Sequence, residues 1–381
     1  MKILQITKYF YPHSGGIENN VLGISEGLVE RKHKVIVLSS NFPKSAKYEI
    51  YHGVEIHRSR ILFTVFRDPF ALGMLINLLK KDYDLIHLHL PDPFSSFFAF
   101  FASIIRKKPL IVTYHADIIK EGLHYKILKF FYGFFQEVLL KHSKVIIATS
   151  PNYVNESEIL RKFINKIEII PNFVDEKKFS PEINPEKLRK VKEKYSLTNK
   201  KVILFVGRLV PYKGISYLIE AFEEVKKKIK NAKLVISGSG PLEKKLKEKS
   251  RGVDDITFIN ANADELPLIF RSADVFVLPS ITRQEAFGIA LLEAMSSGVA
   301  CISTKISGMP FVLGDAGILV EPKNSKQLSE AIISILSNKT FANELGKKAR
   351  IRVEENFTKD KVVGKLINLY ERVLIEDKSE T

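Results

Sequence analysis

Short apolar runs alternate with longer amphipathic stretches through the first part of the chain. The runs predict strands at residues 2–7, 34–39, 84–90, 110–114, 145–149 and 167–170. Residues 19–31 have helical spacing and complete a βαβ unit with the strands on either side. Because these strands are apolar at nearly every position, they are typical of a parallel sheet covered on both faces.

A second alternating series follows a connection at residues 171–199, which holds three prolines, many charges and a short helical stretch at 185–195. Its strands are predicted at residues 202–206, 233–237, 256–259, 275–278, 300–303 and 318–320. Two helical stretches close the chain, at 359–375 and at 325–356, and we expect the latter to be broken. The two series predict an α/β protein of two doubly wound, Rossmann-like domains, 1–175 and 176–358, that face a central cleft.

The composition is that of a globular protein with more than one core. Of 381 residues, 45% are hydrophobic and 27% are charged. Cys301 is the single cysteine, which excludes a disulfide framework within the chain. The first residues lack the apolar segment of a signal peptide, and the longest apolar stretch, 93–105, is about half the length that spans a bilayer. We therefore expect a cytoplasmic protein without a transmembrane helix.

The formal net charge is +16 and is spread over both halves of the chain. Such an excess favours anionic partners, which include nucleotides, lipid headgroups and nucleic acid. We expect no nucleic-acid partner, because the chain has neither zinc-finger spacing nor an aromatic RNA-binding motif.

Two glutamates stand out in the stretch 283–298, which is written RQEAFGIALLEAMSSG. Glu285 precedes a Phe-Gly pair in a predicted loop, whereas Glu293 interrupts an apolar helical run. A carboxylate in that run needs hydrogen-bonding partners, for which sugar or ribose hydroxyls are candidates. The helix is predicted to begin near Gly288, where free N–H groups favour a phosphate. The spacing alone is equally compatible with an ordinary amphipathic helix that carries one glutamate at its edge.

Glycines and cations follow several predicted strands. Arg208 and Lys213 come after strand 202–206, where both suit a diphosphate, although solvated surface charge is the alternative. Gly15 and Gly16 precede the first helix and could let a phosphate approach the backbone, or simply form a tight turn. Gly238 lies in a glycine turn after strand 233–237. A Rossmann dehydrogenase is not expected there, because the required third glycine is absent.

His115 and Asp117 emerge from strand 110–114 at the edge where ligands bind such sheets. Either could bind a hydroxyl of a sugar or acceptor, and a structural histidine is the alternative. Asp82 and Asp84 resemble a metal–diphosphate pair but precede a strand, at the opposite edge. We therefore expect no metal site. His87 and His89 alternate on strand 84–90 and are interpreted as core or cleft wall.

Phenylalanines are concentrated between residues 94 and 135, where nine of the 26 lie. They are interleaved with the basic residues Arg106, Lys107, Lys108, Lys126 and Lys129. An aromatic and basic surface of this kind can rest on an anionic membrane, although packing of helices on the sheet would also explain it.

The motifs taken together resemble the family 4 retaining glycosyltransferases, which have the GT-B fold. The resemblance covers nearly the whole chain. It rests on YPHSGGIENN at 11–20, VGR with KG at 206–208 and 213–214, GSGP at 238–241, LPS followed by EAFG and LEA between 278 and 294, and IPNFVD at 170–175. A softer match, HLHLPDPF and VTYHADI, is similar to a subgroup that transfers mannose- or rhamnose-type sugars in polysaccharide assembly.

The resemblance implies a role for each matching residue. Domain 1–175 would bind the acceptor, domain 176–358 the nucleotide-sugar donor, and a last helix at about 359–376 would pack back on the first domain. Arg208 and Lys213 would hold the donor diphosphate. Contacts to the rest of the donor would come from Glu285 and the backbone of Phe287, Gly288 and Ile289 at the sugar, Glu293 at the ribose, and Gly238 and Asn260 at the base. His115 would lie by the sugar and acceptor, with Asp117 on the acceptor side.

The implied activity is transfer of a mannose-type or glucose-type hexose from a UDP- or GDP-sugar to a glycan or lipid-linked acceptor, without metal or cofactor. The chain departs from the family at residues 259–262, INAN, which lack a glycine and leave the choice between uridine and guanosine open. Two alternatives share the fold: a nucleotide-sugar 2-epimerase and a non-catalytic subunit that binds a sugar nucleotide. The two glutamates and two cations argue against the latter.

Overall fold

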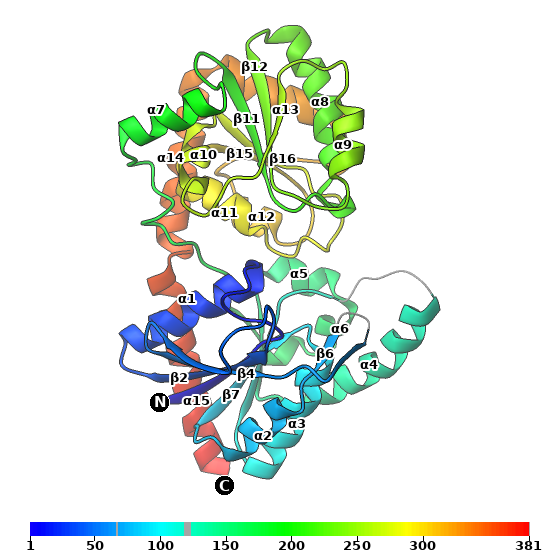
Figure 1. Ribbon diagram of the computed structural model, residues 1–381, viewed down its shortest axis with the longest axis vertical. Coiled ribbons are helices and arrows are strands. Elements are labelled where there is room, and N and C mark those ends of the chain that lie inside the picture. Colours follow the sequence, from blue (N-terminus) through cyan, green and yellow to red (C-terminus); the bar gives the residue numbers. More distant parts are fainter. Residues whose placement is uncertain (66–67, 118–122, 381) are drawn as a thin grey trace. The chain divides into compact units, whose positions relative to one another are not determined.

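The computed structural model describes residues 1–65, 68–117 and 123–380, with side chains omitted at 123–131 and 380. The chain divides into two compact units. Unit 1 comprises Met1–Asn172 and Lys359–Thr381, and unit 2 comprises Phe173–Thr358. The chain therefore passes twice between the units, and both of its ends belong to unit 1 (Figure 1).

The sheet of unit 1 has eight strands in the order β10-β9-β8-β7-β1-β2-β4-β3. All neighbours are parallel except β3 and β4, which form an antiparallel edge. The strands are β1 (Lys2–Ile6), β2 (Lys34–Ser40), β3 (Tyr48–Tyr51), β4 (Val54–Ser59), β7 (Leu85–Leu90), β8 (Leu110–Tyr114), β9 (Val145–Ala148) and β10 (Ile167–Ile169). The short hairpin of β5 (Phe63–Val65) and β6 (Asp68–Phe70) stands outside this sheet.

Helices cover the sheet of unit 1 because their apolar faces pack on its buried strands. They are α1 (Gly16–Glu30), α2 (Gly73–Lys80), α3 (Pro93–Arg106), α4 (Leu123–His142), α5 (Pro151–Glu156), α6 (Glu158–Arg161) and α15 (Lys359–Glu380), with the turn η1 (Ile164–Lys166). Helix α3 contacts α2, α4 and the strands β7 and β8, whereas α15 packs against α1 (Figure 1). The last helix thus completes the unit that the first residues begin.

Unit 2 has a wholly parallel sheet of six strands in the order β13-β12-β11-β14-β15-β16. The strands are β11 (Lys201–Val206), β12 (Ala232–Ser237), β13 (Ile256–Ile259), β14 (Val275–Leu278), β15 (Ala300–Thr304) and β16 (Ile318–Val320). The order reverses between β11 and β14. In a doubly wound sheet, that point is where a crevice opens beyond the carboxyl ends of the strands.

The helices of unit 2 enclose one continuous hydrophobic core. They are α7 (Pro185–Lys194), α8 (Ile215–Lys228), α9 (Glu243–Lys249), α10 (Leu266–Ser272), α11 (Ile289–Ser296), α12 (Met309–Leu313), α13 (Ser325–Ser337) and α14 (Lys339–Asn356), with the turn η2 (Pro211–Lys213). Asn338 separates α13 from α14 and caps the latter by accepting a hydrogen bond from the backbone N–H of Phe341 at 3.0 Å. The expected break in this stretch is therefore confirmed.

The sequence pattern missed the region between residues 41 and 83, which holds β3 to β6 and α2. The expectation of a purely parallel first sheet was wrong at its edge, because residues 51–54 turn back directly and pair β3 with β4. Among the helices of the described residues, none has the length and apolar content needed to cross a bilayer.

Candidate active site

Two neighbouring strands of unit 2 bring a lysine and a glutamate together. After β11 the chain turns through η2, which ends at Lys213, and after β14 it enters the loop that carries Glu285. The ammonium of Lys213 forms an ion pair with Glu285 Oε2, and both side chains are about nine-tenths buried. The Ser280 hydroxyl donates to the same carboxylate oxygen at 3.1 Å. Burial removes water from the pair, so each charge depends on its partner and on any ligand beside it.

Glycines allow the backbone segments at this edge to approach closely. Gly238 has φ +137°, and a Cβ there would lie 2.1 Å from the carbonyl oxygen of Gly207. A Cβ on Gly207 itself would lie 3.5 Å from the Lys213 ammonium. The contact of Gly238 with Gly207 gives this glycine a structural role, whether or not it also lines a base.

Helix α11 begins at this edge with unsatisfied donors. Gly288 is its N-cap, in the left-handed region at φ +81°, and no side chain caps the helix. Within the described part of the chain, the backbone N–H groups of residues 287–290 have no hydrogen-bond acceptor. Open N–H groups at a helix start, with the positive end of the helix dipole, form a seat for an anion.

Glu293 lies one turn further along α11 and is half-buried. Burial raises the pKa of its carboxyl to about 8, although the charges of Lys178 and Lys213 oppose this shift. At neutral pH the group is therefore mostly protonated and can donate a hydrogen bond as well as accept one.

Arg208 and Asn260 are both exposed at the same edge, after β11 and β13. Arg208 follows Gly207 directly, and its guanidinium has no ion-pair or hydrogen-bond partner among the residues that the structure describes. Half-buried Tyr212 lies between the two cations in sequence. Burial raises the pKa of its phenol, which stays neutral. The edge thus offers an open guanidinium, a paired ammonium and a set of free N–H groups.

The sheet of unit 1 places His115 at the carboxyl end of β8, with 7% of the residue exposed. His115 Nε2 lies 3.0 Å from His89 Nδ1, and His89 Nε2 lies 2.7 Å from Gln5 Oε1. Burial lowers the pKa of His115 to about 4 and that of His89 well below its usual range. Both imidazoles are therefore neutral at physiological pH.

Asp117 forms hydrogen bonds within unit 1 through both its side chain and its backbone. Its Oδ1 accepts hydrogen bonds from the hydroxyls of Tyr114 at 2.7 Å and Ser157 at 2.9 Å. Its backbone N–H donates to the hydroxyl of Tyr153 at 2.5 Å. These contacts explain the residue structurally, and its expected role on the acceptor side stays a prediction.

Gly15 and Gly16 lie where the sequence pattern predicted, as N-cap and first residue of α1. No side chain caps this helix, so its first N–H groups are also open within the described residues. A Cβ on Gly15 would lie 2.4 Å from Glu18 Oε2, the far end of a flexible side chain. The backbone of Gly15 is extended and the Glu18 side chain can move aside, so neither backbone strain nor space requires a glycine here.

Asp82 and Asp84 lie at the amino edge of the unit 1 sheet. The carboxylate of Asp84 accepts from the backbone N–H of Lys2 at 2.7 Å, and Asp82 pairs with the Lys2 ammonium. The described residues contain no group of three side chains arranged to ligate a metal.

Sequence comparisons match both units. The family profile described as Glycosyltransferase Family 4 matches residues 14–178, and that described as Glycosyl transferases group 1 matches residues 187–352. O-antigen chain mannosyltransferase C of Escherichia coli is 31% identical over 388 residues, with 100% of both chains covered. The chain belongs to the family 4 glycosyltransferases. D-rhamnosyltransferase WbpZ of Pseudomonas aeruginosa is 28% identical and covers 94% of this chain and 92% of its own.

Structural comparison establishes the GT-B fold of the glycosyltransferase. The structure of HepE from Anabaena in complex with UDP and glucose superposes with a TM-score of 0.79, at 18% identity, and covers 98% of this chain and 100% of its own. At that identity the likeness concerns the fold alone.

Three buried polar residues of the glycosyltransferase were given no role from the sequence. Ser280 was quoted only as part of a motif, and Gln5 is a lone polar residue within an apolar strand. Asp92 follows β7, is buried, and caps α3 by accepting from Ser95 N–H at 3.4 Å. Burial raises the pKa of Asp92 to about 6. For Gln5 the available signal was a polar residue at a position that the strand pattern requires to be buried, whereas Ser280 and Asp92 follow the carboxyl ends of β14 and β7.

Proposed function

We propose that this glycosyltransferase moves a mannose-type or glucose-type hexose from a UDP- or GDP-sugar to a glycan or lipid-linked acceptor in polysaccharide assembly. The relatives that are named as a mannosyltransferase of O-antigen chains and a D-rhamnosyltransferase support a mannose-type sugar. The structural neighbour with bound UDP and glucose supports a nucleotide-sugar donor.

The proposal rests on the carboxyl edge of the unit 2 sheet. Buried Lys213 and unpaired Arg208 follow β11 there, and the open N–H groups of residues 287–290 follow its neighbour β14. Nucleotide departure places negative charge on the diphosphate. Two cations and a helix start stabilise such charge without proton transfer from the protein. We assign Glu285 to the transferred sugar, Glu293 to the ribose, and Gly238 and Asn260 to the side of the base.

The proposed reaction needs neither metal nor cofactor and retains the configuration of the sugar. The bond from the anomeric carbon to the diphosphate breaks, and the acceptor oxygen forms the new bond on the same face. The acceptor proton passes to the leaving phosphate, so charge and atoms balance. Lys213 and Arg208 hold that phosphate, and His115 lies on the side of the acceptor in unit 1. Asp117 would support that side through its own contacts.

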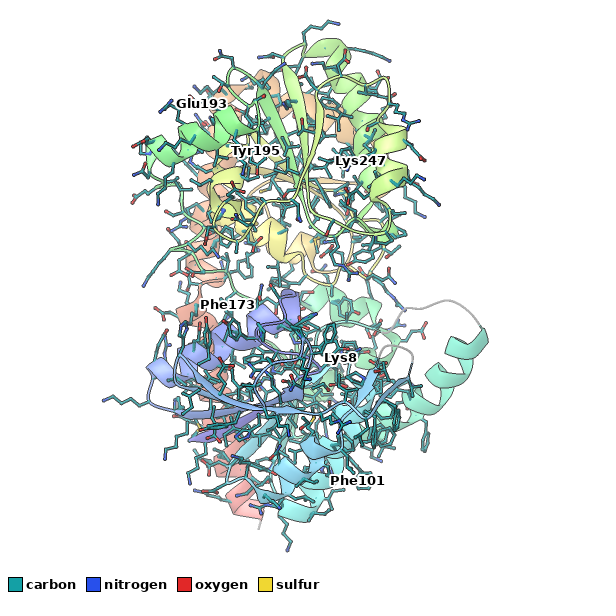
Figure 2. All side chains as sticks on the ribbon, in the orientation of Figure 1. Lys8, Phe101, Phe173, Glu193, Tyr195 and Lys247 are labelled. Atoms are coloured by element: carbon teal, nitrogen blue, oxygen red, sulfur yellow. The ribbon has the colours of Figure 1, made fainter. Side chains whose placement is uncertain are left out.

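We further propose that unit 1 rests on an anionic membrane that carries the acceptor. Apolar side chains are exposed along one face of α3, at positions 97, 101, 104 and 105, and on α4 at Phe134 and Val138. Phe101, labelled in Figure 2, is 50% exposed. Arg106 ends α3, and Lys107 and Lys108 follow it. The side chains of Lys126 and Lys129 lie outside the described residues. Apolar side chains beside basic ones suit the surface of anionic lipids.

A panel of UDP- and GDP-sugars in a thermal-unfolding assay tests the proposed donor. A ligand at 100 times its dissociation constant adds about 2.7 kcal/mol to stability, which the assay resolves. The stabilising donor is then incubated with and without a glycan acceptor, and products are separated. A glycosylated acceptor supports the proposal. An epimerised nucleotide-sugar from donor alone would instead identify an epimerase, and binding without turnover would identify a non-catalytic subunit.

A further inference from the structure

Six buried side chains of unit 1 form one line of hydrogen bonds that begins at His115 and passes through the C-terminal helix. From His115 the line runs through His89 to Gln5, and the Gln5 Nε2 atom lies 3.4 Å from the hydroxyl of Tyr370 in α15. That hydroxyl lies 2.7 Å from His87 Nδ1, and His87 Nε2 lies 2.6 Å from the Thr113 hydroxyl. We call this set the histidine line; its members are Gln5, His87, His89, Thr113, His115 and Tyr370.

The side-chain amide of Gln5 determines which atom donates and which accepts at each contact of the histidine line. Its Oε1 can only accept, so His89 Nε2 must carry the proton between them. A neutral imidazole has one N–H, and the Nδ1 atom of His89 is therefore an acceptor. His115 Nε2 must then donate to it. On the other side, Gln5 Nε2 donates to the Tyr370 oxygen, Tyr370 donates to His87 Nδ1, and His87 Nε2 donates to Thr113.

In this arrangement every contact in the line has one donor and one acceptor. One ring nitrogen of the line takes part in none of these contacts. His115 Nδ1 has a lone pair and no hydrogen-bond partner among the described residues. Burial disfavours a second proton on the ring and lowers its pKa to about 4. The free nitrogen is therefore an acceptor at physiological pH, and it lies at the carboxyl end of β8.

We propose that Gln5 and His89 are positioning residues that hold His115 as its Nε2–H tautomer, so that Nδ1 accepts a hydrogen bond from a hydroxyl of the bound sugar or acceptor. The inference rests on the proposed function for the identity of that ligand. It specifies the ligand chemistry at His115: a hydroxyl donor is accepted there, whereas a phosphate or carboxylate oxygen, which has no proton to give, is disfavoured.

Two features make the proposal testable. Turning the Gln5 amide over would reverse every donor and acceptor in the line and place the proton on His115 Nδ1, so the tautomer is a direct readout. The chain also offers a matched control. Thr113→Val is isosteric and removes only the acceptor at the far end of the line, beyond Tyr370.

The experiment is ¹⁵N NMR of the imidazole rings in the full-length protein, with His115→Asn to assign the signal. We expect a neutral His115 with the proton on Nε2 in the unsubstituted protein and in Thr113→Val. Gln5→Met removes the fixed acceptor and should give a mixture of both tautomers. Its kcat/KM should fall about tenfold, as for one lost orienting hydrogen bond.

A proton on His115 Nδ1 in the unsubstituted protein would overturn the proposal, as would an unchanged tautomer in folded Gln5→Met. If that variant does not fold, Tyr370→Phe replaces it. This change removes the group that orients the Gln5 amide, and a tautomer identical to that of the unsubstituted protein would then count against the proposal. Because the NMR readout needs no turnover, a protein with the expected tautomer and no transferase activity would refute the proposed function alone.

Discussion

The carboxyl edges of the two sheets differ in how fully their polar groups are paired within the protein. In unit 1 the imidazoles of the histidine line are neutral, and each member of the line is paired with the next. In unit 2 a buried ion pair, Lys213 with Glu285, lies beside an unpaired Arg208 and a helix start with open N–H groups. The first edge is nearly complete without a ligand, whereas the second keeps charge and donors available for one.

Burial disfavours the charged form in both units, and it therefore shifts the pKa values of histidines and carboxyls in opposite directions. Low polarity disfavours the charged form, so it lowers the pKa of histidines and raises that of a carboxyl. In unit 1 the pKa values of His115 and His87 fall to about 4 and about 3. In unit 2 that of Glu293 rises to about 8. The histidine line and Glu293 should therefore contribute to the pH dependence of stability with opposite signs.

The largest expected effect is that the amides of unit 1 lose protection against hydrogen exchange when the pH is lowered. Below pH 6.5 the unfolded histidines bind protons that the folded ones refuse, so stability falls as the pH drops toward 4. The shift at His115 alone corresponds to roughly 3 kcal/mol. Hydrogen exchange of amides in β7 and β8, corrected for intrinsic rates, should accelerate between pH 6.5 and 4.5. Amides of β12 and β13 in unit 2 serve as the internal reference, and equal acceleration in both units would contradict the comparison.

Removal of the buried ammonium tests unit 2. Lys213→Ala should lower kcat on the order of 100-fold, because one preorganised cation at the leaving group is lost. The change also leaves Glu285 without its cation, so turnover is referred to the folded fraction measured by thermal unfolding. Lys244→Ala, an exposed lysine of α9, is the control. Turnover near that of the control in folded Lys213→Ala would end the assigned role.

Glu293 should reverse the pH trend of unit 1. Between pH 4.5 and 8 the unfolded carboxyl ionises while the folded one stays protonated, so stability falls as the pH rises. Glu293→Gln lacks this penalty, and its gain over the unsubstituted protein should grow by about 2 kcal/mol from pH 5 to pH 8, less than full linkage because the group is only half-buried. Urea unfolding at both pH values measures it, and a constant difference would disprove the shift.

The same position also tests donor binding. Glu293→Ala should weaken donor affinity with little effect on the chemical step, because the residue is assigned to the ribose. Normal donor affinity in this variant would show that the two glutamates do not divide the donor as proposed. Isothermal titration with the stabilising nucleotide-sugar provides the measurement.

The smallest effect is expected at Arg208. Its guanidinium is exposed and lacks a partner within the described residues, so Arg208→Ala should leave the unfolding temperature unchanged. Donor affinity should fall about tenfold, as for one lost charge-assisted contact. A fall in stability without a fall in affinity would mean that the residue serves the fold rather than the ligand.

The sequence predicted the strands that are near-continuous apolar runs, half-buried β10 among them, and missed β3 to β6. The strand at 110–114 has no exposed residue, and its bounds were predicted without error. Strand β3 alternates between exposed and half-buried positions, β4 begins with alternating buried and half-buried positions, and the pair turns at Gly53. Such a pattern of period two does not contain a continuous apolar run. The bounds of the strands at 256–259, 275–278 and 318–320 were also predicted without error. Those of the other predicted strands differ by one residue, because the hydrogen bonds that end a strand come from its neighbours.

The candidate site was only partly predictable for a similar reason. Glycines and cations after strands could be placed at the correct edge, because parallel strands carry their ends to one side. Partners could not be placed. Nothing local to Glu285 indicates that Lys213 takes its charge, and nothing local to Gln5 indicates Tyr370, which lies far along the chain. Such contacts depend on tertiary packing.

The division of the chain also sets the order in which its parts can be completed during synthesis. Unit 2 is one continuous segment, whereas unit 1 needs residues on both sides of it. Tyr370, which bonds His87 across 283 positions, leaves the ribosome only after all of unit 2. Until then His87 and Gln5 lack the tyrosine hydroxyl that both contact, and α1 lacks the helix that packs on it. The nascent chain can therefore finish its donor-side unit first, and the histidine line closes last.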